Sequence, residues 1–139
     1  MLVKDIMTHD VISVDPDASV LNAARLMLKN HISDLPVVDK NGKPVGILTE
    51  ADFLEFIVGP ERVAEKCKVE EIMTPDPYTV KEEDSLEHLV EEMQRRCINR
   101  LPVVRDGQMV GIVSGTNLVV AAPWRISYLE HLVTRWPER

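Results

Sequence analysis

Two stretches of the chain repeat the same helical pattern of hydrophobic positions. In residues 19–27 and 85–93 the apolar side chains recur at spacings of three and four, which places them on one face of a helix. Ser19 and Ser85 begin these stretches, and a serine oxygen can accept a hydrogen bond from an unpaired backbone N–H at a helix start. We therefore predict two amphipathic helices whose apolar stripes belong to a protein core. The stripe residues are Val20, Ala23, Ala24 and Met27, then Leu86, Leu89, Val90 and Met93.

Short segments rich in β-branched residues lie on both sides of each helix. Such residues favour strands because a side chain branched at Cβ packs well on a pleated surface. Asn41-Gly42 and Asp106-Gly107 interrupt the segments after each helix, and both pairs favour the positive φ that a tight hairpin needs. A second helix is expected in each half, from about Glu50 to Val58 and from about Thr116 to Ala121. The expected strands are VISV (11–14), LPVVD (35–39) and VGILT (45–49), then PYTV (77–80), LPVVR (101–105) and VGIVS (110–114).

The two halves are copies of one sequence. VKDIMTHDVISV (3–14) returns as VEEIMTPDPYTV (69–80), and NHISDLPVVD (30–39) returns as RCINRLPVVR (96–105). The period is longer than the usual solenoid repeat. We therefore predict an α/β protein of two packed subdomains, each ordered β-α-β-β-α, with a small sheet and helices on one face. The predicted boundaries are 1–58 for subdomain 1, 59–68 for a connector, 69–122 for subdomain 2 and 123–139 for a C-terminal amphipathic helix.

The composition excludes several classes of protein. With 45% hydrophobic and 28% charged residues the chain is expected to be globular, and no apolar run approaches the roughly 20 residues of a membrane span. The net charge of −7 disfavours nucleic acid and anionic lipid as partners. MLVKDIM lacks the apolar core of a secretory signal, and Cys67 and Cys97 form no CxxC motif, so a cytoplasmic protein is expected. A basic cluster is sufficient for one small anion and consists of Arg95, Arg96, Arg100 and Arg105.

The sequence contains no motif that predicts catalysis or metal binding. His9, His31, His88 and His131 are scattered along the chain without the spacing of metal ligands. The sequence has no GxSxG, no Walker-type glycine loop and no pair of carboxylates placed for acid–base chemistry. We therefore predict no catalytic residue, no metal site and no enzymatic activity.

The ordered motifs resemble the cystathionine β-synthase (CBS) domain. DIMT near the start, SVxxAAxxM on the first helix, LPVVD before the hairpin and VGILTxxD at its end follow one another, and related motifs recur in the second half. Two such domains in tandem resemble a Bateman module, and the resemblance spans the chain apart from its C-terminal tail. It implies two copies related by pseudo-two-fold symmetry. The chain is similar to stand-alone CBS-domain proteins, which carry no attached effector domain.

The resemblance implies a non-catalytic regulatory module. Such modules bind adenosine-containing ligands (AMP, ADP, ATP or S-adenosylmethionine) in clefts between the repeats, as regulatory ligands rather than catalytic cofactors. They signal by a conformational or packing change. The implied partners are a second copy, in a homodimer formed through the subdomain helices with the C-terminal helix as a further candidate contact, and an unidentified effector protein. The alternative is a constitutive dimerisation or scaffold protein that has lost ligand binding, which Asp34 and Asn117 modestly support.

The resemblance also implies which residues would bind the nucleotide. The hydroxyl-x-x-Asp loop of the family falls on Thr49 and Asp52, and on Ser114 and Asn117 in the second copy. Adenine is expected against the first strand of each copy and the apolar segment before each Leu-Pro pair. Site 1 would comprise Val11, Ile12, Ser13, Ile32, Asp34, Pro36, Gly46, Thr49 and Asp52. Site 2 would comprise Pro77, Tyr78, Thr79, Ile98, Arg100, Pro102, Gly111, Ser114 and Asn117.

The residue types themselves favour a polar site where the strand turns into the helix. Gly46 and Gly111 would let a ligand approach the backbone, since glycine has no Cβ. A hydroxyl at a helix start can donate to a phosphate, and an ionised Asp52 can accept both hydroxyls of a ribose cis-diol. The alternative for Thr49 and Asp52 is plain helix capping. Because Asn117 has one acceptor oxygen, we expect unequal sites, with the Asp52 site about 10-fold to 100-fold tighter for ribose.

Overall fold

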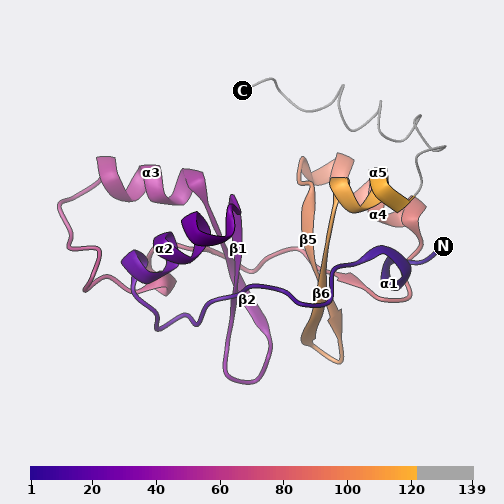
Figure 1. The fold of residues 1–139 in the computed structure, drawn as a ribbon, viewed down its shortest axis with the longest axis horizontal. Helices are drawn as coiled ribbons and strands as arrows, with labels where there is room; N and C mark the ends of the chain where they lie inside the picture. The colour runs from indigo at the N-terminus through magenta and orange to yellow at the C-terminus, as the bar shows by residue number, and fades with distance from the viewer. Residues whose placement is uncertain (122–139) are drawn as a thin grey trace. The chain divides into compact units, whose positions relative to one another are not determined.

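The computed structural model describes residues 1–121, which form two compact units (Figure 1). The first-repeat unit consists of residues 12–77, and the second-repeat unit combines residues 1–11 with the chain from Tyr78 onward. The units therefore differ from the predicted subdomains, because the opening segment of each repeat packs on the sheet of the other repeat. We call residues 3–8 and 69–75 the exchanged segments. The predicted C-terminal helix at 123–139 lies outside the described residues.

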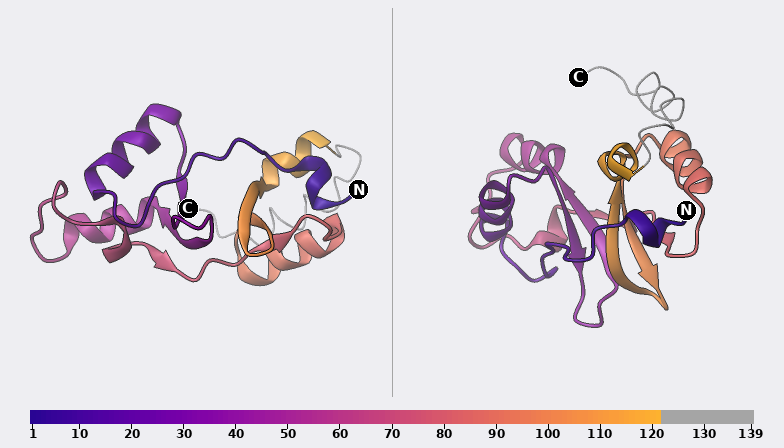
Figure 2. Two further views of the ribbon diagram at one scale, coloured as in Figure 1. Left: turned by 90° about the horizontal axis from the view of Figure 1, so that it is seen from below. Right: turned by 45° about the vertical axis from the view of Figure 1, so that its right-hand side comes forward.

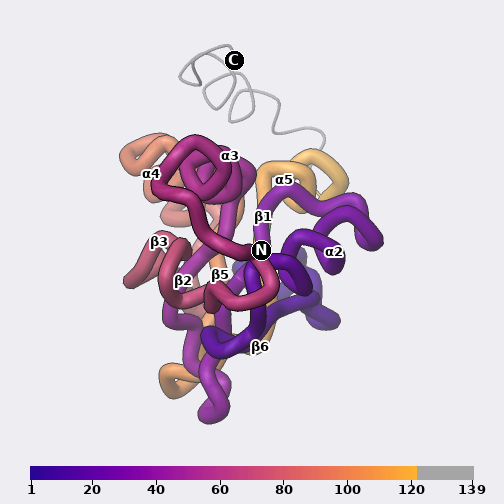
Figure 3. The backbone as a smooth tube through the Cα atoms, turned by 90° about the vertical axis from the view of Figure 1, so that its left-hand side faces the viewer, coloured from indigo at the N-terminus to yellow at the C-terminus, as the bar shows by residue number. Residues whose placement is uncertain are grey.

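The first-repeat unit contains a three-stranded antiparallel sheet with two helices on one side (Figure 1). Strand β2 lies in the centre and pairs with β1 and with β3, which comes from an exchanged segment. Figure 3 follows the backbone of these elements as a tube. In chain order they are α2 (Val20–Asn30), β1 (Asp34–Val38), β2 (Pro44–Thr49), α3 (Glu50–Val58), the 3-10 helix η1 (Val69–Glu71) and β3 (Thr74–Pro75). The hydrophobic core cluster consists of Ala23, Met27, Leu35, Val37, Leu48 and Val69, and Val20 and Cys67 are buried as well.

The second-repeat unit contains a mixed three-stranded sheet. Strand β5 lies in the centre, parallel to β4 and antiparallel to β6. The chain can be followed in Figure 2 from the indigo helix α1 toward α2. Before it leaves this unit, the Thr8 N–H donates to the Ile112 carbonyl at 2.8 Å and the Ile112 N–H donates to the Thr8 carbonyl at 3.0 Å. The elements are α1 (Val3–Ile6), β4 (Val80–Lys81), α4 (Leu86–Arg96), β5 (Arg100–Arg105), β6 (Gln108–Ser114) and α5 (Gly115–Ala121).

The core of the second-repeat unit includes apolar residues from the exchanged segment. Helix α1 contributes Val3 and Ile6, and Met7 follows them, so this segment is part of the hydrophobic core of the unit. Burying such side chains is the main favourable contribution to folding. The other members of this hydrophobic core cluster are Val80, Leu86, Leu89, Val90, Met93, Leu101, Val103, Val113 and Leu118.

The predicted helix starts and apolar stripes are confirmed. Ser19 Oγ accepts a hydrogen bond from the Asn22 N–H at 3.0 Å, and Ser85 Oγ accepts one from the His88 N–H at 3.1 Å. Met27 lies in the core and is 6% exposed. Helices α2 and α4 also end alike, because the residue after each is in the left-handed conformation. None of the helices in the described part of the chain is long and apolar enough to cross a bilayer.

The first expected strand of each repeat is shorter than predicted. Within VISV only Val14 reaches the sheet, where it forms an isolated parallel bridge with Val37. Within PYTV only Val80 is in a strand, the two-residue β4. Pro77 lacks the N–H that a ladder needs, which is consistent with the late start of β4. The two hairpins and the helices that follow them match the predicted order.

Candidate functional site

The turn between β2 and α3 contains the first candidate group. Thr49 is the N-cap of α3, and Asp52 is the third residue of the helix. Asp52 Oδ2 accepts hydrogen bonds from the Thr49 backbone N–H at 2.9 Å and from Thr49 Oγ1 at 3.2 Å. In return, Thr49 Oγ1 accepts from the Asp52 N–H at 3.4 Å. This reciprocal arrangement is a capping box, so helix capping does describe Thr49 and Asp52 in this structure.

Asp52 also bonds to Thr74 in the exchanged strand β3. Thr74 Oγ1 donates to Asp52 Oδ1 at 3.2 Å. Asp52 is 9% exposed and is the only buried charged residue among residues 1–121. Because burying a carboxylate is costly unless its oxygens have partners, Thr49 and Thr74 together hold this side chain in one orientation. The sequence prediction did not include Thr74, although the repeated Ile-Met-Thr motif was a signal that could have indicated it.

The second-repeat unit contains the same arrangement with an amide in place of the acid. Asn117 Oδ1 accepts from the Ser114 backbone N–H and from Ser114 Oγ, both at 2.8 Å. Ser114 Oγ accepts from the Asn117 N–H at 3.3 Å. Asn117 Nδ2 donates to Thr8 Oγ1 at 3.4 Å. Asn117 therefore donates to Thr8, whereas Asp52 accepts from Thr74.

The two hydroxyls predicted to donate to a phosphate have internal acceptors instead. The Thr49 hydroxyl donates to Asp52, and the Ser114 hydroxyl donates to Asn117. A hydroxyl has one proton to donate. Neither Thr49 nor Ser114 can therefore donate to a ligand while its loop keeps the observed bonds.

The space beside each predicted glycine contains part of an exchanged segment. A Cβ on Gly46 would collide with Met73 Sδ and would lie 3.0 Å from the Thr74 carbonyl oxygen. A Cβ on Gly111 would lie 2.8 Å from Met7 Sδ and 2.8 Å from the carbonyl oxygen of Thr8. The close approach that requires glycine is therefore made by the protein's own chain. The contribution of Gly46 and Gly111 to a ligand site stays a prediction.

Several other predicted residues lie next to these loops in the sheets. Asp34 is the register partner of Thr49, and Arg100 is the register partner of Ser114. Pro36 and Pro102 lie two residues further along the same strands and are buried. Pro36 is the register partner of Ile47, and Pro102 is the register partner of Ile112. Ile32 and Ile98 are half-buried and pack against the cores of their units.

The segments predicted to face adenine lie where the chain passes from one unit to the other. One crossing falls between Val11 and Ile12, and the other falls between Pro77 and Tyr78. Ser13 and Thr79, the last residues of these two predicted segments, are exposed. The contribution of these six residues to a ligand site stays a prediction.

The Tyr78 ring already has a stacking partner. The Arg96 guanidinium carbon lies 3.7 Å from the ring centroid of Tyr78, a cation–π contact. Arg96 Nε also donates to Glu92 Oε2 at 2.7 Å, which lowers the pKa of Glu92 and raises the pKa of Arg96. Arg95 pairs with Glu92 as well, and Arg105 pairs with Glu82 at 2.6 Å. Arg95, Arg96 and Arg105, which were predicted to help hold an anion, are therefore paired with carboxylates.

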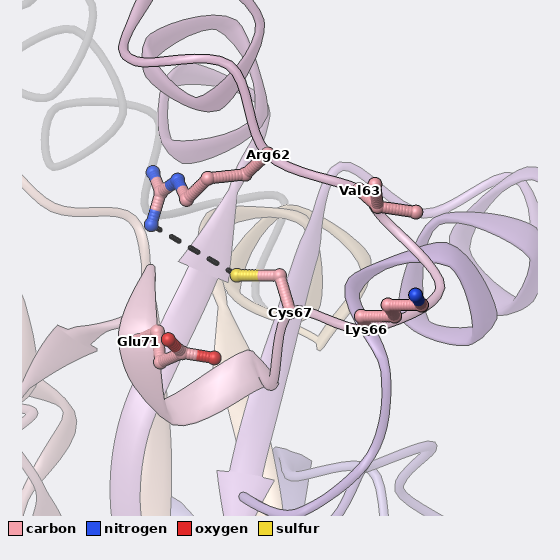
Figure 4. Close-up of a pocket in the computed structure, with 5 residues that line it drawn as sticks. All are labelled: Arg62, Val63, Lys66, Cys67 and Glu71. Carbon is pink, nitrogen blue, oxygen red and sulfur yellow. Dashed lines mark hydrogen bonds between the residues drawn. The ribbon is translucent and has the colours of Figure 1, made fainter.

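A small pocket lies in the connector, away from the predicted site residues. Cys67 is buried beneath it and accepts a weak hydrogen bond on Sγ from Arg62 Nη1 at 3.9 Å. Burial raises the pKa of the Cys67 thiol, and the neighbouring Glu71 carboxylate adds to this effect. No group of three or more His, Cys, Asp and Glu side chains within residues 1–121 is placed to hold a metal ion. The pocket has a volume of 220 Å³ and is lined by Arg62, Val63, Lys66, Cys67 and Glu71 (Figure 4).

Two solved structures share this fold and carry adenosine ligands. The CBS domain pair of protein MJ0100, in complex with 5′-methylthioadenosine and S-adenosyl-L-methionine, superposes with a TM-score of 0.76 at 32% identity. The match covers 90% of this chain and 98% of that one. CBSX2 in complex with AMP superposes with a TM-score of 0.77 at 30% identity, covering 91% of this chain and 98% of that one.

The sequence comparisons give the same relationship. The L-aspartate semialdehyde sulfurtransferase of Methanocaldococcus jannaschii is 35% identical over 118 residues. That stretch is 84% of this chain and 22% of the much longer relative. The CBS domain model matches twice, over residues 3–59 and 69–123. The two matches cover most of the chain, which therefore belongs to the CBS domain family and contains two CBS domains in tandem.

Proposed function

We propose that this CBS pair is a non-catalytic regulatory module that binds an adenosine-containing ligand. The candidates are AMP, ADP, ATP and S-adenosylmethionine, and the bound ligand would act on an effector protein through a conformational or packing change. The observation that carries the proposal is the fixed orientation of Asp52, whose carboxylate is held by Thr49 and Thr74. The adenosine ligands of MJ0100 and CBSX2, both at least 30% identical to this chain, support the choice of ligand class.

The two predicted sites are proposed to differ in strength. Asp52 can offer a charged acceptor to a ribose hydroxyl, and a hydrogen bond to a charged group contributes about 1.5–3 kcal/mol. Asn117 offers an uncharged amide at the corresponding position, and its oxygen already accepts two hydrogen bonds. The site that includes Asp52 is therefore proposed as the tighter one for a nucleoside with a free ribose.

Titration calorimetry with AMP, ATP and S-adenosylmethionine tests this ranking. The Asp52→Ala variant is expected to lose about 10-fold to 100-fold in affinity for the tightest ligand. Asn117→Ala is the matched control from the other repeat, with an expected loss below about 3-fold at that site. If Asp52→Ala leaves binding intact while Asn117→Ala abolishes it, the ranking is wrong.

The second candidate function is a constitutive scaffold that has lost ligand binding. It is favoured by the observation that Thr49, Asp52, Ser114 and Asn117 bond to one another and to the exchanged segments without any ligand. A thermal-shift screen separates the two functions, because a ligand at about 100 times its Kd adds about 2.7 kcal/mol to folding stability. No shift with any adenine nucleotide or S-adenosylmethionine at millimolar concentration favours the scaffold.

A homodimer formed through the helices is part of the proposal. Helix α3 carries a stripe of exposed apolar side chains, Leu54 at 62%, Ile57 at 72% and Val58 at 82% exposure. Contiguous exposed apolar surface of this kind is typical of protein interfaces. Sedimentation of Ile57→Glu is expected to show a shift toward monomer, whereas the polar control Glu55→Gln on the same helix is expected to retain the dimer. Equal sedimentation of both variants and the unaltered chain would exclude α3 from the interface.

A further inference from the structure

The pocket beside Cys67, which we call the connector pocket, has charged side chains of both signs around a buried thiol. The Arg62 guanidinium and the Glu71 carboxylate both lie near the sulfur, whereas the Lys66 side chain is directed away from it (Figure 4). All the lining residues fall within residues 12–77, so the first-repeat unit alone forms the pocket. Its volume of 220 Å³ is below the range of about 300–1,000 Å³ that is typical for drug-sized ligands. A ligand that fits it is therefore smaller than an adenine nucleotide.

The partners of Arg62 within residues 1–121 are weak. Arg62 Nη1 donates to Cys67 Sγ at 3.9 Å, and the guanidinium carbon lies 5.1 Å from the ring centroid of Phe56. A thiol sulfur is a poor acceptor. In the same part of the chain Arg62 forms no ion pair with a carboxylate. Because a guanidinium has five N–H donors in a fork that fits a carboxylate, most of the donors of Arg62 remain for a ligand.

Glu71 keeps acceptor positions for a cation. Its Oε2 accepts a hydrogen bond from the Lys68 backbone N–H at 2.6 Å. This bond, the Cys67 side chain and the positive charge of Arg62 lower the pKa of Glu71, so the carboxylate is ionised at neutral pH. An ionised carboxylate has about four lone-pair positions, which leaves room for an ammonium group. The negative charge of Glu71 also disfavours a dianion such as inorganic phosphate beside Arg62.

A ligand that carries both a carboxylate and an ammonium matches these two side chains. We propose that the connector pocket binds a small α-amino acid, with its carboxylate on Arg62 and its ammonium on Glu71. The charges of Arg62 and Glu71 cancel, which favours a zwitterion over a simple anion. Val63 adds apolar surface for a short side chain. The connector pocket shares no residue with the predicted nucleotide sites, so this second ligand does not depend on the proposed adenosine ligand.

The connector pocket is joined to the start of helix α2. The Cys67 carbonyl accepts a hydrogen bond from the N–H of Val20, the first residue of that helix, at 2.9 Å. The chain between Arg62 and Glu71 therefore helps to hold the helix start. An amino acid that bridges Arg62 and Glu71 stabilises the first-repeat unit, because a ligand that binds only the closed form opposes local opening.

NMR titration of the full chain with glycine, alanine, serine and valine tests the proposal. Binding is followed through the backbone amide signals of residues 62–71, and at least one of the four is expected to shift them to saturation. Its N-acetyl derivative lacks the ammonium and its amide derivative lacks the carboxylate, so each should bind at least about 10-fold more weakly. Absence of binding by all four at millimolar concentration would overturn the inference. Tighter binding of inorganic phosphate than of any amino acid would overturn it as well.

Three exposed lining residues provide matched variants that are expected to fold. Arg62→Gln should lose at least about 10-fold in affinity for the amino acid, whereas the control Lys66→Gln should stay within about 3-fold. Glu71→Gln keeps an oxygen for the Lys68 N–H and loses the charge. It should weaken the amino acid by about 10-fold and leave the N-acetyl derivative unchanged or tighter. Equal losses from Arg62→Gln and Lys66→Gln would show a general attraction to positive charge and overturn the inference.

Hydrogen exchange tests the effect on the first-repeat unit. With the amino acid at about 100 times its Kd, exchange at the start of α2 is expected to slow by about 100-fold. Arg62→Gln should abolish this protection. Unchanged exchange with the ligand bound would show that the connector pocket does not stabilise the helix start. Failure of the amino acids to bind overturns this inference and leaves the proposed adenosine ligand unaffected.

Discussion

The Asp52 loop and the Asn117 loop share one hydrogen-bonding arrangement and differ in the charge of one side chain. In each loop the side chain bonds back to the hydroxyl residue at the start of the helix and across to a threonine of an exchanged segment. The threonine donates to the acid in one unit and accepts from the amide in the other. Because a hydroxyl can do either, the charge of the loop can change while its packing is kept.

The two units also differ in the size of their hydrophobic cores. Among residues 1–121, the hydrophobic core cluster of the first-repeat unit contains six residues, and that of the second-repeat unit contains twelve. Three residues of the larger cluster, Val3, Ile6 and Met7, come from the exchanged segment. Since buried apolar area is the main favourable term in folding, we expect the first-repeat unit to be the less stable of the two.

The largest effect is expected from truncating matched core leucines. Leu35 and Leu101 occupy the same place in β1 and β5 and are 0% and 1% exposed. Replacing either with alanine is expected to cost about 2–5 kcal/mol of unfolding free energy. Hydrogen exchange should show lost protection mainly in residues 12–77 for Leu35→Ala and mainly in the second-repeat unit for Leu101→Ala. Equal loss of protection in both units for both variants would mean that the two units unfold in a single cooperative step.

A smaller effect is expected from removing the side chains that distinguish the loops. Asp52→Ala removes a capping box and the Thr74 bond from a buried position, and is expected to cost about 1–3 kcal/mol in urea unfolding. Asn117→Ala should cost less, because its bond to Thr8 is longer and lies at an exposed position. Asp52→Asn is the conservative control and should retain most of the stability. A greater loss from Asn117→Ala would reverse the comparison.

The two cysteines are expected to differ in the rate at which they react with a thiol reagent. Cys67 is buried at 5% exposure, whereas Cys97 is exposed. The thiolate is the reactive form, and burial raises the pKa of Cys67, so Cys97 is expected to react with a thiol reagent at least about 10-fold faster. A Cys97→Ser variant should show only the slow phase. Reaction of both thiols at one rate would contradict the burial of Cys67.

The raised pKa of Cys67 also predicts a dependence of stability on pH. The folded chain holds the thiol proton more tightly than the unfolded chain, so its contribution is complete below the ordinary thiol pKa of 9.0. Stability is then lost as the pH rises from that value toward the higher folded-state pKa. Cys67→Ala should lack this part of the alkaline loss in urea unfolding measured at several pH values. If the unfolding free energy of Cys67→Ala and of the unaltered chain fell equally at alkaline pH, Cys67 would not contribute to this loss of stability.

The smallest effect is expected at the matched helix ends. His31 and Cys97 follow α2 and α4 with φ of 53° and 54°, in the left-handed region that favours glycine. Replacing either with glycine is expected to raise the unfolding free energy by about 0.5–1 kcal/mol. Because the backbone angles agree, the two gains in thermal melts should be similar. A gain at only one of them would show that the side chain of the other contributes contacts of its own.

Much of the fold follows from local signals in the sequence. The serine caps, the apolar stripes of α2 and α4, the two hairpin glycines and the order of elements all depend on residues close together along the chain. Such signals act through local hydrogen bonds and backbone preferences, so they can be read without knowing the rest of the structure. The hydroxyl-x-x-Asp loop is local in the same sense, and its internal bonds span three residues.

The exchange of the opening segments was decided by the tertiary structure alone. The two repeats are so similar that either Ile-Met-Thr segment carries the residues to pack on either sheet, and no local preference distinguishes the two pairings. The bonds of Thr74 to Asp52 and of Thr8 to Asn117 join residues far apart along the chain. The sequence by itself therefore determined that each loop has an acid or an amide at this position. Only the folded chain determined which threonine bonds to it, and hence which hydrogen bonds remain for a ligand.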